Sequence, residues 1–201
     1  LIDSAIDQGN IAYNLALCAL LQDDLKVAER WIEASRFAYR ESGGVPSALL
    51  LLEAQAARNR EAWDEAAALL DQIEADGADM EGVLGARLLL LRADVERARG
   101  NTDEARIHLN ALTPRMLERL SPLLRADHEQ VGAHLLEADG AKREAAAAVD
   151  RQVRWLKQGG VYERMSLALI RAARLYEETG DHPSSARRYL RAAQSMKGQG
   201  N

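Results

Sequence analysis

The chain has 201 residues, which is enough for one domain or one short repeat array. It holds 36 Ala and 30 Leu but only 18 β-branched residues, so a sheet protein is excluded and helices are expected throughout. A net charge of −5 with interspersed signs argues against a nucleic-acid binder, because phosphate neutralisation needs a net-basic face.

The pattern of apolar residues and turn signals, taken in chain order, predicts five helix pairs. The expected helices cover residues 3–22 and 24–42, 46–59 and 62–76, 81–99 and 102–112, 122–139 and 141–158, and 160–179 and 183–197. The stretch from Thr113 to Leu120 does not fit this pattern, and it either extends the third pair or forms a small extra helix. We expect a single domain over residues 1–201, with repeats at 3–42, 46–76, 81–112, 122–158 and 160–197.

The helix pairs recur at a nearly constant spacing along the chain. Gly100, Gly140 and Gly180 are evenly spaced, and each is expected to end a helix in the left-handed conformation. A small residue follows each turn, at steps of 38, 39, 40 and 41: Ala28, Ala66, Ala105, Ala145 and Ala186. The leucine runs at 49–52 and 88–91 are separated by the same step as Ala66 and Ala105, so two unrelated features support the same repeat.

These patterns resemble the tetratricopeptide (TPR) repeat. The fullest matches are Leu169, Ala173, Tyr176 and Gly180 in the last repeat, and Ala54, Trp63, Ala66 and Leu70 in the second. The resemblance implies an all-α solenoid of about five antiparallel helix pairs in a right-handed superhelix. TPR repeats are typically about 34 residues long, so a HEAT-like array is the alternative at this longer period.

The sequence carries no recognisable catalytic or metal-binding motif. It has no nucleophile elbow, no phosphate-binding Gly-rich loop and no His-Glu-x-x-His. His128 and His134 are six residues apart and fall on different faces of a helix, so no metal site is expected. Cys18, in an apolar helix, is expected to be a small buried residue rather than a nucleophile. We therefore expect neither an enzyme nor a cofactor.

A TPR-like array implies a concave groove, lined by the first helix of each pair, that holds a peptide or protein segment. The expected function is thus a protein-interaction scaffold. Projecting the family's groove positions gives Asn10, Tyr13, Gln55, Arg58, Asn59, Arg87, Asp94, Arg97, Asp127, Gln130, His134, Glu137, Arg174 and Glu177. Arg58 and Arg97 take the same place in successive repeats, so we expect them to grip a carboxylate of an acidic partner. The carboxylate clamp of chaperone adaptors is not supported, because its places hold Tyr13, Leu17, Leu51 and Leu52.

Two alternatives follow from charge and composition. Residues 1–81 carry 16 acidic and 6 basic residues, whereas residues 82–201 carry 15 acidic and 20 basic residues. Copies of the chain are therefore candidates for head-to-tail self-association as a homo-oligomer. The chain is also a candidate for the sensor or interaction half of a larger bacterial regulator; 22 of its 26 basic residues are Arg, which is typical of GC-rich bacterial genomes.

The longest apolar run, Leu15 to Leu21, is much shorter than a membrane span, so a soluble product with no direct membrane span is expected. The chain begins at Leu1 without an initiator Met, which suggests a trimmed or processed product. The sequence does not identify the cellular compartment. A processed or lipid-anchored periplasmic protein is favoured over a cytoplasmic one.

Overall fold

The computed structural model describes residues 4–77 and 82–197. These residues form eleven α-helices and no β-strand, so the protein is all-α, as the sequence predicts. The helices are α1 (Ala5–Leu21), α2 (Leu25–Glu41), α3 (Ser47–Asn59), α4 (Trp63–Ala75), α5 (Gly82–Ala98), α6 (Thr102–Asn110), α7 (Pro114–Arg119), α8 (Pro122–Ala138), α9 (Lys142–Gln158), α10 (Tyr162–Glu178) and α11 (His182–Lys197). The predicted helix starts at residues 3 and 81 lie outside the described residues.

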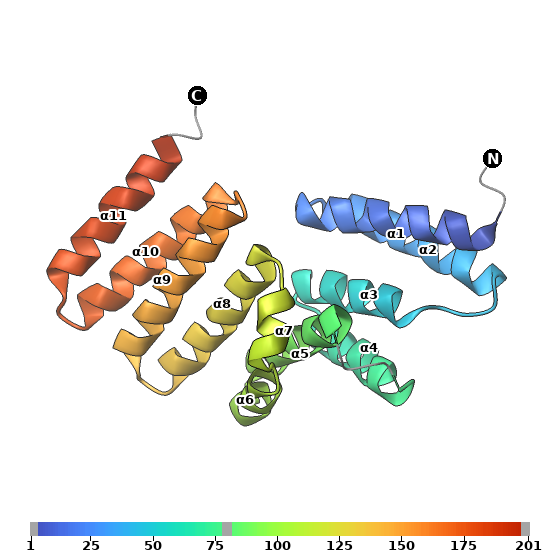
Figure 1. Cartoon of the computed structure of the whole chain (residues 1–201), viewed down its shortest axis with the longest axis horizontal. Helices are drawn as coiled ribbons and strands as arrows, with labels where there is room; N and C mark the ends of the chain where they lie inside the picture. Colours follow the sequence, from blue (N-terminus) through green and yellow to red (C-terminus); the bar gives the residue numbers. More distant parts are fainter. Residues whose placement is uncertain (1–3, 78–81, 198–201) are drawn as a thin grey trace. The chain divides into compact units, whose positions relative to one another are not determined.

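Contacts between helices divide the chain into two compact units, Leu1–Arg99 and Gly100–Asn201. The first unit contains α1 to α5 and the second contains α6 to α11 (Figure 1). The boundary falls inside the third predicted helix pair. The expectation of a single repeat domain over residues 1–201 stays a prediction.

In the first unit, each helix packs against the next one described. Helices α1 and α2 form one pair and α3 and α4 form another, while α2 contacts α3 and α4 contacts α5. The first helices also touch one another, α1 against α3 and α3 against α5. The leucine run at 49–52 lies in the core with at most 3% of each side chain exposed, which explains its four consecutive apolar residues.

In the second unit, α8 to α11 lie side by side in a row (Figure 1). Their core is rich in alanine: Ala145, Ala146, Ala148 and Ala172 are at most 1% exposed. Because a methyl group occupies little space, these positions allow neighbouring helix backbones to approach closely. The unassigned stretch at Thr113 to Leu120 contains α7, so the small extra helix is the alternative that the structure supports.

The turns within the pairs α1–α2, α3–α4, α8–α9 and α10–α11, and the turn between α5 and α6, each contain one residue with positive φ. These residues are Asp23, Glu61, Gly100, Gly140 and Gly180, with φ values of 61°, 60°, 87°, 76° and 78°. The left-handed caps predicted at the three glycines are confirmed. The first two turns hold the same conformation without glycine, which residue type alone did not indicate.

A small buried residue follows each left-handed residue by five positions. Ala28, Ala66, Ala105 and Ala145 are fully buried, as the repeat predicts. In the last pair, however, the fifth residue after Gly180 is Ser185, which is 5% exposed, and the predicted Ala186 is exposed. The buried small residue of the last pair is therefore Ser185, and Ala186 lies one residue beyond it.

None of the described helices combines the length and apolar character that a bilayer crossing requires.

Candidate functional site

The candidate site lies at the C-terminal ends of two neighbouring first helices, α3 and α5. Arg58 is near the end of α3, Arg97 is near the end of α5, and Asp94 lies one turn before Arg97. Arg58 donates from Nε and Nη2 to Oδ2 of Asp94, at 2.8 and 2.6 Å. Arg97 donates from Nε and Nη2 to the other carboxylate oxygen, Oδ1, at 3.0 and 2.7 Å. One carboxylate thus joins both guanidinium groups.

This arrangement gives Arg58 and Arg97 a carboxylate partner within the chain itself. The two guanidinium groups do converge on a carboxylate, but the carboxylate is Asp94, which the sequence placed on the groove surface and which is only 4% exposed. Burial acts to raise the pKa of Asp94, but the charges and hydrogen bonds of the two arginines outweigh it and hold that pKa below its usual range. Asp94 therefore stays ionised and accepts hydrogen bonds from Nε and Nη2 of both arginines.

A pocket of about 270 Å³ opens beside this cluster. Its lining, which we name the α3–α5 pocket, consists of Asp23, Arg58, Asn59, Glu61, Trp63, Asp94 and Arg97. Four of these residues were predicted groove residues, and Arg58 also donates from Nη1 to Oδ1 of Asn59, at 3.2 Å. Asp23 and Glu61 were missed because they lie in turns rather than on a first helix. The sequence signal that could have identified Asp23 and Glu61 is their position, because the later repeats have glycine at the equivalent place in the turn.

The other predicted groove residues of the first unit lie outside this pocket. Arg87 donates to Oε1 of Gln55 at 3.5 Å, which links α5 to α3. The hydroxyl of Tyr39 donates to Oδ1 of Asn10 at 2.6 Å, so Asn10 holds α1 against α2. Tyr13 is half-buried in the same pair of helices. These side chains stabilise the helix packing and are not grouped in one binding site.

In the second unit, two of the three predicted acidic groove residues are already paired. Asp127 and Glu137 on α8 form ion pairs with Arg164 and Arg171 on α10. Gln130 accepts a hydrogen bond from Nε2 of Gln152 at 3.0 Å. The two arginines were not predicted as site residues; the signal for them was an opposite charge on the next first helix, 37 and 34 residues further along the chain.

The remaining groove predictions in this unit do not form a cluster with these pairs. His134 is half-buried on α8, whereas Arg174 and Glu177 lie on α10, Arg174 exposed and Glu177 near its end. Tyr189 of α11 donates to Oε2 of Glu177 at 3.4 Å.

Cys18 is exposed, so the prediction of a small buried residue was wrong. Helix α1 buries its alanines, Ala12, Ala16 and Ala19, and leaves Leu15 and Cys18 on its outer side. The mean apolar character of this helix did not reveal which side faces the core, because large apolar residues occur on both sides. Among the described residues, no three His, Cys, Asp or Glu side chains are grouped so that they would hold a metal ion.

The fold and the site together define an all-α protein of recurring helix pairs, with a charged pocket at the ends of two first helices. No family model matches the chain, and no curated protein matches it. The resemblance to the TPR repeat therefore stays a prediction.

Proposed function

We propose that the chain is a non-catalytic protein-interaction module whose α3–α5 pocket binds a basic segment of a partner protein. The observation that carries this proposal is the conformation of Asp23 and Glu61, with φ of 61° and 60°. An L-residue other than Gly costs about 1 kcal/mol in this region. The three later turns avoid this cost with glycine. The two turns without glycine each contribute a residue to the lining of the α3–α5 pocket. Strain kept at a pocket is typical of a binding role.

The charges around the pocket favour a basic ligand. Asp94 offsets one of the two positive charges of Arg58 and Arg97. The side chains of Asp23 and Glu61 are exposed and form no ion pair with any residue of the described chain, and they bring the net charge of the lining to −1. The half-buried ring of Trp63 lies in the same lining and offers a face for a cation. This proposal replaces the acidic ligand that the sequence suggested.

The net charge of the whole first unit also favours a basic ligand. Residues 1–99 carry 18 acidic and 10 basic residues, a net charge of −8. Such a field raises the local concentration of basic partners and speeds their association.

The double variant Asp23→Gly/Glu61→Gly tests the proposal, because it removes both carboxylates and relieves both turns. We expect it to bind Lys- and Arg-containing peptides on a charge-varied peptide array at least tenfold more weakly than the unmodified chain, while its urea midpoint does not fall. The matched control is Asp64→Asn/Glu65→Gln, which removes two exposed carboxylates of the same unit outside the pocket and should leave binding unchanged. A preference for acidic peptides, or unchanged binding by the glycine variant, would contradict the proposal.

Head-to-tail self-association is the second candidate, and charge asymmetry favours it. Residues 100–201 carry 13 acidic and 16 basic residues, a net charge of +3 against −8 in residues 1–99. Light scattering in low and high salt tests it: an assembly that appears only in low salt supports it, whereas the mass of one chain in both conditions excludes it.

A further inference from the structure

The last two helix pairs are related by a constant shift along the sequence. Helices α8 and α10 begin at Pro122 and Tyr162, and the left-handed turns that follow them contain Gly140 and Gly180, so both features give the same shift. Each residue of the α8–α9 pair therefore has a counterpart one repeat later in the α10–α11 pair. A comparison of counterparts shows what one pair contains and the other lacks.

In the α8–α9 pair, an aromatic ring and a carboxylate lie between the helices. The guanidinium of Arg125 lies 4.7 Å from the centre of the Trp155 ring, and Trp155 packs against the core of the unit. Arg151 of α9 forms an ion pair with Glu129 of α8, at 2.9 Å. The ring fills space and the carboxylate neutralises an arginine.

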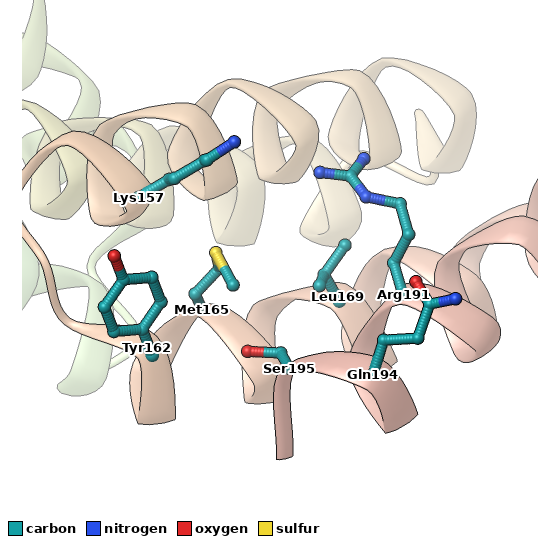
Figure 2. Close-up of a pocket in the computed structure, with 7 residues that line it drawn as sticks. All are labelled: Lys157, Tyr162, Met165, Leu169, Arg191, Gln194 and Ser195. Atoms are coloured by element: carbon teal, nitrogen blue, oxygen red, sulfur yellow. The ribbon is translucent and has the colours of Figure 1, made fainter. Parts of the chain in front are cut away.

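The α10–α11 pair lacks both groups. Ser195 is the counterpart of Trp155, and Leu169 is the counterpart of Glu129, whereas the arginine remains as Arg191. Where the ring and the carboxylate would lie, the structure has a pocket of about 350 Å³ (Figure 2). We name it the α10–α11 pocket; its lining residues are Lys157, Tyr162, Met165, Leu169, Arg191, Gln194 and Ser195.

The lining combines two cations with an apolar floor. Lys157 and Arg191 extend into the pocket from opposite sides, above Met165 and Leu169 (Figure 2). Within the described part of the chain, neither cation forms an ion pair, and the buried Oγ of Ser195 has no hydrogen-bond partner. Two like charges with no counter-charge favour an anion between them, and an unused hydroxyl adds a donor for it.

We propose that the α10–α11 pocket binds an aromatic carboxylate. The ring takes the place that the Trp155 indole has in the preceding pair and rests on Met165 and Leu169, where thioether and methyl groups contact it. The carboxylate lies between Lys157 and Arg191, as Glu129 does beside Arg151. This site is separate from the α3–α5 pocket and takes a ligand of opposite charge.

N-acetyl-L-tryptophan is the probe, because it joins one ring to one carboxylate. Ligand-observed saturation-transfer NMR and isothermal titration measure its binding to the whole chain. We expect at least tenfold weaker binding for N-acetyl-L-tryptophan amide, which lacks the charge, and for N-acetyl-L-alanine, which lacks the ring. Equal affinity for the acid and its amide, or no binding of the acid, would overturn the proposal.

Two variants locate the site. Ser195→Trp restores the ring of the preceding pair and should abolish probe binding by filling the pocket. Arg191→Gln changes an exposed residue, so the fold should stay intact while probe binding weakens at least tenfold. The matched control is Arg154→Gln, which changes an exposed arginine of α9 outside the pocket and should leave probe binding unchanged. If Arg191→Gln binds the probe as the unmodified chain does, the pocket is not the site.

A pentapeptide with a C-terminal Trp separates the two sources of such a ligand. Tighter binding of the pentapeptide than of N-acetyl-L-tryptophan assigns the site to a protein C-terminus, and equal binding assigns it to a free aromatic acid. If neither ligand binds, the proposal fails.

Discussion

Asp94 joins two helices because it satisfies two arginines at once. An isolated carboxylate at 4% exposure would be costly, but four hydrogen bonds from Arg58 and Arg97 compensate for the lost hydration. The same cluster forms one wall of the α3–α5 pocket. Asp94 therefore has a role both in stability and in the shape of the site.

Replacing Asp94 with Asn tests the role in stability. The variant leaves both guanidinium groups without a counter-charge, and we expect a loss of about 2 kcal/mol, below the range for fully buried pairs because both arginines are partly exposed. Urea unfolding at pH 7 measures it. The control is Asp103→Asn, whose carboxylate pairs with Arg106 at the surface and should change stability by less than about 0.5 kcal/mol.

The pH dependence of stability gives a second test of Asp94. Because the folded state lowers the pKa of Asp94, its contribution is fully present above the unfolded pKa of about 3.9 and is lost as the pH falls through the folded pKa. We therefore expect the free energy of unfolding to fall less steeply on acidification below about pH 5 in Asp94→Asn than in the unmodified chain. Parallel curves would contradict this assignment.

Gly140 tests the left-handed turns. A Cβ at this residue meets no atom within 4 Å, so Gly140→Val costs only the backbone strain at a φ of 76°, about 2 kcal/mol. Thermal and urea unfolding measure this loss. Gly44→Val is the control, because that Cβ also meets open space and the backbone is outside the left-handed region, so we expect little change. An unaffected Gly140→Val would show that this turn does not need the left-handed conformation.

The sequence predicted the site residues in part. Arg58 and Arg97 take the same place in successive repeats, and in the structure both donate to Asp94; their predicted grip on a partner's carboxylate stays a prediction. The burial of Asp94 was not predictable from its type, since its partners come from both its own helix and a neighbouring one. The turn residues Asp23 and Glu61 were missed because their residue types do not indicate a left-handed conformation, and only alignment with the glycines of the later repeats could have indicated it.

At the scale of elements, the helix ends that fall on described residues lie within two residues of their predicted positions. Their accuracy reflects local chemistry: Ser121 caps α8 and Pro122 begins it, and left-handed residues end several others. Which face of a helix is buried depends on its neighbours. The exposed side chains of Cys18 and Ala186 show that the local sequence pattern does not determine which face of a helix is buried.

Ala66 tests the packing of α4 against its neighbours. It is fully buried in the core of the first unit, so Ala66→Leu should overpack the contact and cost about 1 to 3 kcal/mol in urea unfolding. Ala68→Leu, at an exposed position of the same helix, should be close to neutral. A neutral Ala66→Leu would contradict the predicted repeat register.

For the whole molecule, the two units differ in the charge of their candidate ligands. The first unit has a net charge of −8 and a pocket with two unpaired carboxylates, and the second has a net charge of +3 and a pocket with two cations. Because exposed charges are screened within about 10 Å at 0.1 M salt, we expect both binding reactions to weaken as salt rises. Titrations in 50 and 500 mM salt, roughly 14 and 4 Å of screening length, measure this dependence.

Site-directed photo-crosslinking tests the central claim most directly. Benzoylphenylalanine replaces Trp63 in the α3–α5 pocket, and in a control chain it replaces Phe37, which is exposed on α2 outside this pocket. We predict that the Trp63 position crosslinks to a partner segment with Lys or Arg near the link, identified by mass spectrometry, and that Asp23→Gly/Glu61→Gly removes this crosslink. A crosslink that survives the double variant, or a linked segment that is acidic, would contradict the account.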